Sequence, residues 1–239
     1  MPKILEVKHL TKRFGELAAV DNLSFDVEEG EVFGIAGPNG SGKTTLFNLI
    51  SGHYSGAGEI VFSGERIDRW RAHRVCQSGL ARTFQIPAVF SSMSVYDNVR
   101  AGVTFGHRSP DKDRIIGEVL AVLGLEGKRN LLAGNLSLFD RKLTMLAAAL
   151  ATQPRLLMLD EPIAGLSPVE IAQSISLFRQ INQDLRVTLI VIEHVMRVLV
   201  QVCDQLMILH DGQRISQGRP EEVARDKRVI EVYLGEEDA

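Results

Sequence analysis

The sequence predicts an α/β protein with a parallel β-sheet at its centre, a small antiparallel β portion and an inserted helical portion. Three features support this prediction. A glycine-rich loop at residues 37–42 lies between an apolar β-type run and a helical pattern. A second apolar run, residues 156–159, ends in two carboxylates. Residues 86–152, between these two regions, have the periodicity of helices.

Composition narrows the class of protein. The chain has 239 residues, 45% of them apolar, which suits one large α/β domain or two small lobes. Its net charge of −3 does not indicate a general affinity for nucleic acid. No apolar run approaches the roughly 18 residues of a membrane span, and the N-terminus lacks a signal-peptide pattern, so we expect any membrane role to come through a partner. The separated Cys76 and Cys203 are typical of reduced thiols in a cytosolic protein.

Short strands are predicted in the first part of the chain, and their closeness in sequence favours antiparallel pairing. They are expected at residues 4–10, 17–20 and 24–27, and another strand is expected at residues 58–62, after the glycine-rich loop. Phe14 lies in the turn after the first of them. An exposed Phe14 could stack on a nucleotide base, or it could cover the small sheet, and the sequence leaves both interpretations open.

A predicted strand at residues 32–36, a glycine-rich loop and a helix from residue 43 match the phosphate-loop motif G-x-x-x-x-G-K-S/T. The glycines allow a tight turn that brings backbone N–H groups close to a phosphate, and the N-terminus of the helix points at the same anion. Lys43 can reach the β- and γ-phosphates of a bound nucleotide, and the Thr44 hydroxyl can ligate Mg²⁺. The predicted nucleotide-binding residues are Gly37, Pro38, Asn39, Gly40, Ser41, Gly42, Lys43, Thr44 and Thr45.

Two carboxylates follow the apolar run between Pro154 and Pro162, which is typical of a fully buried strand. Asp160 and Glu161 stand at its carboxyl end, where open parallel sheets bind ligands. Asp160 can hold Mg²⁺, directly or through water, and Glu161 can accept a proton from attacking water. The alternative is a solvated acidic turn. His194 follows a similar predicted strand and could contact the γ-phosphate or be purely structural.

The remaining elements are predicted from turn and capping signals. A strand is expected to end at Gln85, before Pro87 interrupts the pattern. Ser167 and Glu170 form a capping box that begins a helix. The inserted helices are expected at residues 94–103, 111–123 and 138–152, further core strands at 187–192 and 205–210, and a helical tail at 220–239.

With these residues in place, the chain resembles ABC-type ATPases over nearly its whole length. The resemblance rests on GPNGSGKTT at residues 37–45, LLMLDEP at residues 156–162, Gln85 and His194, and on Phe14 in the place of the family's adenine-stacking aromatic. Within that group it looks most like the ATP-binding subunits of branched-chain amino-acid importers. The sequence segments that carry this resemblance are KRFGELAAVDNLSF, KTTLFNLISG, ARTFQ, AGLSP, VIEHVM and VIEVYLGEE.

The resemblance implies ATP and Mg²⁺ as cofactors and in-line attack of water on the γ-phosphate. It implies that Glu161 is the general base, that Lys43 neutralises developing charge, and that Gln85 and His194 sense and position the nucleotide. The residues expected to hold Mg²⁺ are Thr44, Gln85 and Asp160.

The resemblance also implies an assembly. Two ATPase subunits would form a dimer on the cytoplasmic face of the inner membrane, peripheral to a permease that is served by a solute-binding protein. Each of two ATP molecules would lie between one chain's phosphate loop and the other chain's signature segment. The chain would be one ABC ATPase domain, with a nucleotide-binding core and β lobe at residues 1–85 and 153–239 and a helical subdomain at 86–152.

The chain departs from the family at this signature segment, which usually reads Leu-Ser-Gly-Gly-Gln or Leu-Ser-x-Gly-Gln but here reads LSLFD at residues 136–140. Leu138 and Phe139 stand where glycines would let backbone N–H groups approach a partner's γ-phosphate, and Asp140 adds negative charge near that anion. Ser137 could contact the partner's nucleotide, or with Asp140 it could form a helix N-cap.

We therefore hypothesise a heterodimer, in which a second cassette supplies an intact signature to the site that bears Glu161. A homodimer would carry the altered segment at both sites. The predicted function is ATP hydrolysis that powers an importer for branched-chain or other hydrophobic amino acids. The alternatives are a related importer for urea, amides or aromatic acids, a soluble ABC ATPase acting on nucleic acid or ribosomes, and a regulatory subunit that holds ATP without hydrolysing it.

Overall fold

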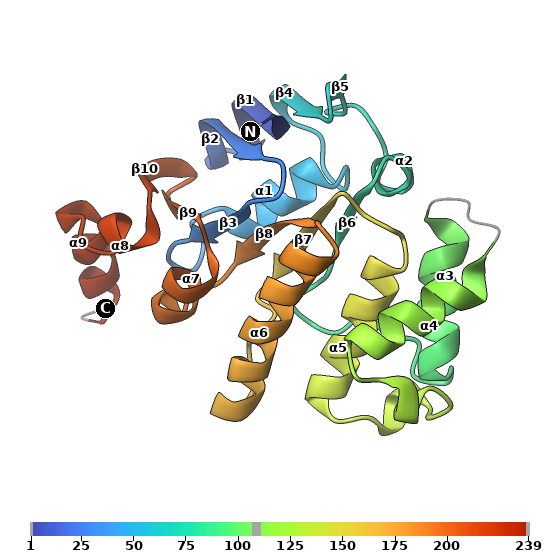
Figure 1. Ribbon diagram of the computed structural model, residues 1–239. Helices are drawn as coiled ribbons and strands as arrows, with labels where there is room; N and C mark the ends of the chain where they lie inside the picture. The colour runs from blue at the N-terminus through green and yellow to red at the C-terminus, as the bar shows by residue number, and fades with distance from the viewer. Residues whose placement is uncertain (1, 107–110, 238–239) are drawn as a thin grey trace.

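Two β-sheets surrounded by helices make up the computed structural model, which describes residues 2–106 and 111–237 (Figure 1). The larger sheet has six strands in the order β10-β9-β3-β8-β7-β6. Its strands are β3 (Val32–Ala36), β6 (Leu80–Arg82), β7 (Leu156–Asp160), β8 (Thr188–Ile192), β9 (Gln205–His210) and β10 (Gln213–Gly218). Its neighbouring strands are parallel except β9 and β10, which form an antiparallel hairpin. The carboxyl ends of β6, β7, β8, β3 and β9 therefore lie along one edge, where α/β sheets bind ligands.

Both faces of the larger sheet are covered, which explains why β3, β7 and β8 are apolar and buried along their whole length. Successive side chains alternate between the faces. In β7, Leu156 and Met158 belong to the hydrophobic cluster that contains the smaller sheet, whereas Leu157 and Leu159 belong to the cluster on the other face.

The smaller sheet is antiparallel, as predicted, with the order β2-β1-β4-β5. Its strands are β1 (Lys3–Phe14), β2 (Leu17–Glu28), β4 (Ala57–Phe62) and β5 (Glu65–Arg66). The prediction of two separate strands at residues 17–20 and 24–27 is wrong. One long strand spans both, because the chain passes the break with a left-handed Asn22 (φ +49°) and shifts of register against β1.

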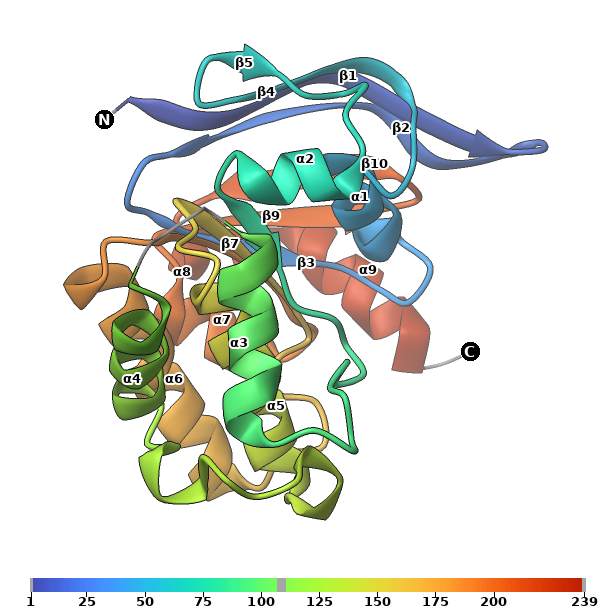
Figure 2. The ribbon, with the colours of Figure 1, turned by 90° about the vertical axis from the view of Figure 1, so that its right-hand side faces the viewer.

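Two helices lie on the side of the larger sheet that faces the smaller sheet. They are α1 (Lys43–Ile50) and α2 (Ala72–Gln77), which Figure 2 shows beneath that sheet. Phe47 of α1 is fully buried in the cluster that joins the two sheets. The helix that follows the phosphate loop is therefore held between two β layers.

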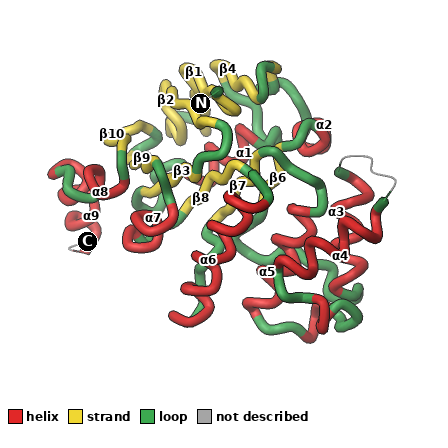
Figure 3. The backbone as a smooth tube through the Cα atoms, in the orientation of Figure 1, coloured by secondary structure: helices red, strands yellow, loops and turns green. Residues whose placement is uncertain are grey.

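Residues 86–152 contain helices and no strand among the described residues, and these helices gather on one side of the molecule (Figures 1 and 3). They are α3 (Val95–Phe105), α4 (Lys112–Val122) and α5 (Leu138–Leu150), with short 3₁₀ turns at Glu126–Lys128 and Ala133–Asn135. Their apolar side chains share one hydrophobic cluster with the central strands. The exact limits of a helical subdomain stay a prediction.

The C-terminal helices are α6 (Pro168–Asp184), α7 (Met196–Val202), α8 (Pro220–Val223) and α9 (Lys227–Glu237). The capping box of Ser167 and Glu170 is confirmed at the start of α6. Residues 238 and 239 of the predicted helical tail lie outside the described residues. None of the helices within residues 2–106 and 111–237 has the length and apolar character that crossing a bilayer requires.

Candidate active site

The phosphate loop joins the end of β3 to the start of α1, as the sequence predicts. Two of its glycines cannot carry a side chain in this backbone. Gly37 has a φ of +149°, and a Cβ there would lie 2.0 Å from the carbonyl oxygen of Leu209. Gly42 has a φ of +103°, and its Cβ would lie 2.2 Å from the carbonyl oxygen of Ala19. Conformation and close packing therefore both require glycine at these positions.

Lys43 folds back into this loop. Its buried Nζ donates hydrogen bonds to the carbonyl oxygens of Gly37 and Pro38 at 2.6 and 2.7 Å, and it lies 3.4 Å from the Ser41 hydroxyl. The ammonium group is thus placed at the concave side of the loop, where an anion would offer it stronger, charge-assisted acceptors.

The rest of the loop leaves polar groups near solvent. Asn39, Gly40 and Thr44 are exposed, whereas Thr45 is half-buried in the first turn of α1. The Thr44 hydroxyl is an oxygen ligand of the kind that Mg²⁺ prefers. The predicted phosphate-binding residues therefore form one continuous surface at the start of α1.

Asp160 is the last residue of β7 and is paired with a buried cation. The Arg82 guanidinium donates from Nη2 to Asp160 Oδ2 at 2.8 Å, and the two side chains are only 6% and 5% exposed. Burial raises the pKa of Asp160, while the hydrogen bond and charge of Arg82 oppose that rise. Sequence analysis did not single out Arg82, although a lone Arg after Leu80-Ala81 in a buried strand was a visible anomaly.

Glu161 follows Asp160 in a left-handed backbone conformation, with a φ of +45°. This conformation is uncommon for a residue with a side chain, and the surroundings hold it in place. The Glu161 N–H donates to the carbonyl oxygen of Ile192, and its own carbonyl oxygen accepts from Lys142 Nζ, both at 3.0 Å. Its carboxylate Oε2 accepts from Gln85 Nε2 at 2.7 Å.

The structure thus brings Gln85 and Glu161 together from positions far apart in the sequence. The strand that leads to Gln85 is shorter than predicted, however, since β6 ends at Arg82. Thr83 still donates its N–H to the Met158 carbonyl oxygen at 2.9 Å, but the chain bends at Gln85 and Ile86 before Pro87, so the strand pairing does not continue although β7 runs on to Asp160. Gln85 consequently lies on an exposed loop and not in the sheet.

His194 lies beyond the end of β8, next to the turn that carries Glu161. Its side chain is 57% exposed, and its Nδ1 lies 3.8 Å from Glu193 Oε2. Because β7 and β8 are paired in register at Asp160 and Ile192, Glu161 and His194 follow adjacent strand ends. The side chain is therefore open to solvent on the ligand edge of the sheet.

Sequence analysis missed two buried charges behind Glu161. Glu193 is fully buried, and its Oε1 accepts a hydrogen bond from the Ile163 N–H at 3.0 Å. Burial raises the pKa of Glu193 to about 7 and lowers the pKa of Lys142. Both residues hold the turn from Glu161 to Ile163. Two in-register strands that each end in acidic residues were the signal that could have revealed Glu193.

Phe14 is 47% exposed and belongs to neither hydrophobic cluster of the described residues. Its ring meets the edge of the Tyr54 ring at a centroid distance of 5.7 Å, and Lys12 Nζ lies 5.2 Å from its centroid. The interpretation of Phe14 as a cover for the small sheet therefore does not fit. An exposed aromatic pair fits the stacking interpretation, which stays a prediction.

The signature segment begins α5, and the predicted N-cap is confirmed. The Ser137 hydroxyl oxygen accepts from the Asp140 N–H at 3.1 Å and donates to Asp140 Oδ2 at 3.0 Å. Lys128 Nζ donates to Asp140 Oδ1 at 2.6 Å. The negative charge expected at Asp140 is therefore compensated by a residue that sequence analysis did not consider.

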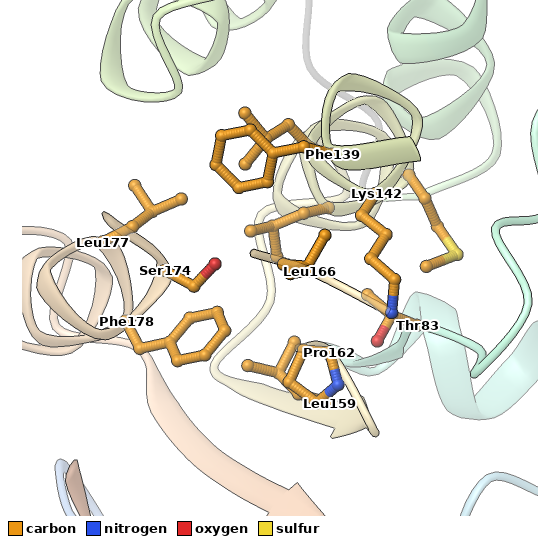
Figure 4. A pocket seen from close by; sticks show the side chains of 12 residues that line it. Thr83, Phe139, Lys142, Leu159, Pro162, Leu166, Ser174, Leu177 and Phe178 are labelled. Atoms are coloured by element: carbon orange, nitrogen blue, oxygen red, sulfur yellow. The ribbon is translucent and has the colours of Figure 1, made fainter. Parts of the chain in front are cut away.

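Phe139 of the same segment lies half-buried against the core (Figure 4). It lines a small cavity of about 20 Å³ between α5, α6 and the turn after β7, together with Lys142, Leu166 and Phe178. The side chain that replaces a glycine thus packs toward α6. Leu138, by contrast, is 40% exposed at the start of α5.

Family models match two parts of the chain. A model described as ABC transporter matches residues 20–164. A second, described as branched-chain amino acid ATP-binding cassette transporter, matches residues 213–239, which include β10 and α9.

Individual proteins match nearly the full length. The chain is 34% identical to the high-affinity branched-chain amino acid transport ATP-binding protein BraF of Pseudomonas aeruginosa, over 98% of both chains. It is 32% identical to the corresponding protein LivG of Escherichia coli, again over 98% of both. Among solved structures, it is similar to the ADP conformation of MJ1267, an ATP-binding cassette of an ABC transporter, with 30% identity and a TM-score of 0.91 over 98% of this chain and 100% of that one.

Proposed function

The chain belongs to the ABC transporter family of ATP-binding proteins, and on that basis we propose that its ATP hydrolysis powers an importer for branched-chain amino acids. One structural observation carries the ATPase part of the proposal. Lys43 in its loop, the Asp160 carboxylate and the Gln85–Glu161 pair all stand at the carboxyl edge of one parallel sheet. The solute class is supported by the match at residues 213–239 and by the names of BraF and LivG.

In this proposal the loop N–H groups and Lys43 bind the triphosphate, and the exposed Phe14 stacks on the adenine. The side-chain oxygens of Thr44, Asp160 and Gln85 fit Mg²⁺, which prefers oxygen ligands and usually combines one or two carboxylates with substrate phosphates. When bound, the ion supplies positive charge that neutralises the phosphate oxygens. The side chains of the protein supply the proton transfer and the positioning of the reacting groups.

Glu161 takes the proton from the attacking water. The water oxygen forms a bond to the γ-phosphorus while the bond from phosphorus to the bridging oxygen breaks, and that electron pair leaves with ADP. Gln85 donates to the same carboxylate and so orients it. His194, open to solvent beside it, is placed to contact the γ-phosphate.

The assembly is part of the same proposal. We place the chain as a peripheral subunit on the cytoplasmic face of the inner membrane, bound to a permease that a solute-binding protein supplies. It pairs with a second cassette, and a heterodimer is favoured because the Ser137 hydroxyl and the Asp140 carboxylate are already engaged with each other. Because these two groups bond to each other, we expect the segment to make few contacts with the nucleotide of the partner.

A Glu161→Gln substitution tests the catalytic assignment. We expect ATP turnover to fall by about 10²- to 10⁴-fold, because the amide cannot accept the proton, while ATP binding is retained. In a strain deleted for this chain, leucine uptake should return with the wild type and not with the variant. ATP turnover is measured as the release of phosphate. Leucine uptake is measured with labelled leucine.

Glu59→Gln is the matched control, since it removes an exposed carboxylate that pairs with Arg66 at the surface. It should hydrolyse ATP and support uptake like the wild type. Turnover by Glu161→Gln above a tenth of wild type would refute the general-base assignment. Normal leucine uptake in the deleted strain, with loss of urea or amide uptake, would refute the solute class.

A further inference from the structure

Arg82 is a deeply buried cation of the described site that the reaction above does not use. It is the last residue of β6, and its side chain is 6% exposed. Burying a charge costs much free energy unless each N–H donor has a hydrogen-bond acceptor. The role of Arg82 therefore depends on the groups to which it donates hydrogen bonds.

Each side of the guanidinium has a partner. Nη2 donates to Asp160 Oδ2 at 2.8 Å, and Nη1 donates to Asn48 Oδ1 at 2.6 Å and lies 3.3 Å from Ser51 Oγ. Nε donates to the Thr83 carbonyl oxygen at 3.3 Å. The planar fork thus makes directional bonds to three separate segments, which a flexible ammonium could not do at once.

Two of these segments carry the proposed metal ligands. Asn48 lies on α1, the helix that begins with Lys43 and Thr44, whereas Asp160 ends β7. One guanidinium therefore connects the helix of Thr44 to the strand of Asp160. Since Mg²⁺ demands nearly ideal octahedral geometry, the distance between these two elements matters for its binding.

Aromatic rings keep the guanidinium in place. Its carbon lies 5.5 Å from the centroid of the buried Phe47 ring and 4.9 Å from that of Phe84. Such contacts favour a cation over the ring faces and limit the access of water. The side chain is consequently restricted by both polar and aromatic contacts.

We propose that Arg82 is a positioning residue for the metal site: by bonding Asn48 and Asp160 together, it sets one carboxylate oxygen of Asp160 and the Thr44 hydroxyl at the spacing that Mg²⁺ requires. The inference rests on the proposed function, because it takes Thr44 and Asp160 as the metal ligands. Arg82 itself contacts neither nucleotide nor metal in this role. It acts through the orientation of the groups that do.

The test is an Arg82→Lys substitution, which keeps the positive charge but cannot bridge Asn48 and Asp160. Mn²⁺ serves as the probe for Mg²⁺ and is titrated into the ATP-bound protein by electron paramagnetic resonance, in the Glu161→Gln background to prevent turnover. The apparent Kd for Mn²⁺ should rise about tenfold. ATP affinity in EDTA should stay within about twofold of wild type, because the loop and Lys43 are untouched.

An Asn48→Ala substitution removes the α1 end of the bridge and keeps the Arg82–Asp160 pair, so it should weaken Mn²⁺ binding in the same direction but less, by about threefold. It also keeps the test decisive if Arg82→Lys does not fold. Arg155→Lys is the control, since Arg155 makes an exposed pair with Glu29 and should change nothing.

Unchanged Mn²⁺ affinity in both folded variants would overturn the inference. A loss of ATP affinity in EDTA as large as the loss of Mn²⁺ affinity would also overturn it, because it would indicate damage to the whole nucleotide site. The proposed function fails in a different way. If the Glu161→Gln protein with native Arg82 binds no ATP or no Mn²⁺ with it, the nucleotide site is wrong, and the inference falls with it.

Discussion

At the scale of single residues, the charges behind Glu161 are the least expected part of the site. Glu193 is fully buried, and its Oε2 accepts no hydrogen bond from any described residue. The titratable groups that face it are Lys142, Glu161 and His194. Burial raises the pKa of Glu193 to about 7. The folded protein therefore holds a proton here that the unfolded chain releases near pH 4.5.

This shift predicts a pH dependence that Glu193→Gln should remove. Because the folded pKa is the higher one, the contribution of Glu193 to stability is largest below about pH 4.5 and is lost as the pH rises to about 7. The variant should gain stability relative to wild type between about pH 5 and about pH 8, by on the order of 1–3 kcal/mol. Urea unfolding at both pH values measures the difference.

The comparison isolates one group. Glu31, whose pKa burial also raises to about 7, is present in both proteins and cancels. The amide oxygen of the substituted side chain can still accept the Ile163 N–H, so the turn after β7 is kept. If the free energy of unfolding changed with pH by the same amount in both proteins, Glu193 would not titrate between these pH values.

The residues that sequence analysis found are those whose spacing along the chain carries their chemistry. Lys43 and Thr44 follow a glycine pattern, and Asp160 and Glu161 end an apolar run. Arg82, Lys142 and Glu193 have no such local pattern. Their partners lie on other elements, so their roles appear only when β6, β7, β8 and α5 are placed side by side.

At the scale of secondary structure, the start of α5 is a capped helix in which Leu138 and Phe139 stand where the family resemblance places glycines. Ser137 and Asp140 exchange two hydrogen bonds, and Lys128 compensates the carboxylate. Sequence analysis gave Ser137 two interpretations, and the cap is the one that this geometry supports. The helix therefore gains stability from groups that elsewhere in the family are expected to face a nucleotide.

Ser137→Ala separates these interpretations. Loss of an N-cap hydroxyl should lower the free energy of unfolding by about 1 kcal/mol. ATP turnover with a partner cassette should stay within about twofold, because the hydroxyl acts only as a cap. Ser176→Ala, on the exposed face of α6, should stay within about 0.5 kcal/mol of wild type. Normal stability with a large loss of turnover would instead assign Ser137 to the nucleotide.

At the same scale, helices and strands were predicted well where periodicity is long and both flanks carry turn signals, as in α6 and β7. The errors lie where tertiary pairing decides. One strand, β2, continues through a bulge that resembles a break in sequence, and β6 stops at Arg82 although its partner β7 continues to Asp160. Neither fact can be found in a local pattern.

At the scale of the whole molecule, the two halves of the proposed nucleotide site differ. The side with the phosphate loop, Asp160 and Glu161 carries the residues that the proposed reaction assigns to this chain. The opposite side, which would act on a partner, carries an exposed Leu138 and a Phe139 that packs toward α6. The molecule is therefore expected to hydrolyse ATP well only when another chain supplies the missing half.

Mixing experiments test this asymmetry. Turnover of the chain alone should be low and should rise at least about tenfold when a partner cassette with an intact signature is added. Leu138→Gly with Phe139→Gly should raise turnover of the chain alone, provided that circular dichroism shows a folded protein, since loss of Phe139 opens the core. High turnover alone that the double substitution leaves unchanged would contradict the heterodimer.

The left-handed backbone of Glu161 has a consequence for how this sequence can change. Glycine adopts a φ of +45° without a steric penalty, so a glycine here would relax the turn by roughly 1 kcal/mol and abolish the carboxylate. Selection for robustness alone would favour that exchange. Under the proposed mechanism, the chain instead keeps a strained residue where the reaction needs a carboxylate, so its most stable version would be inactive.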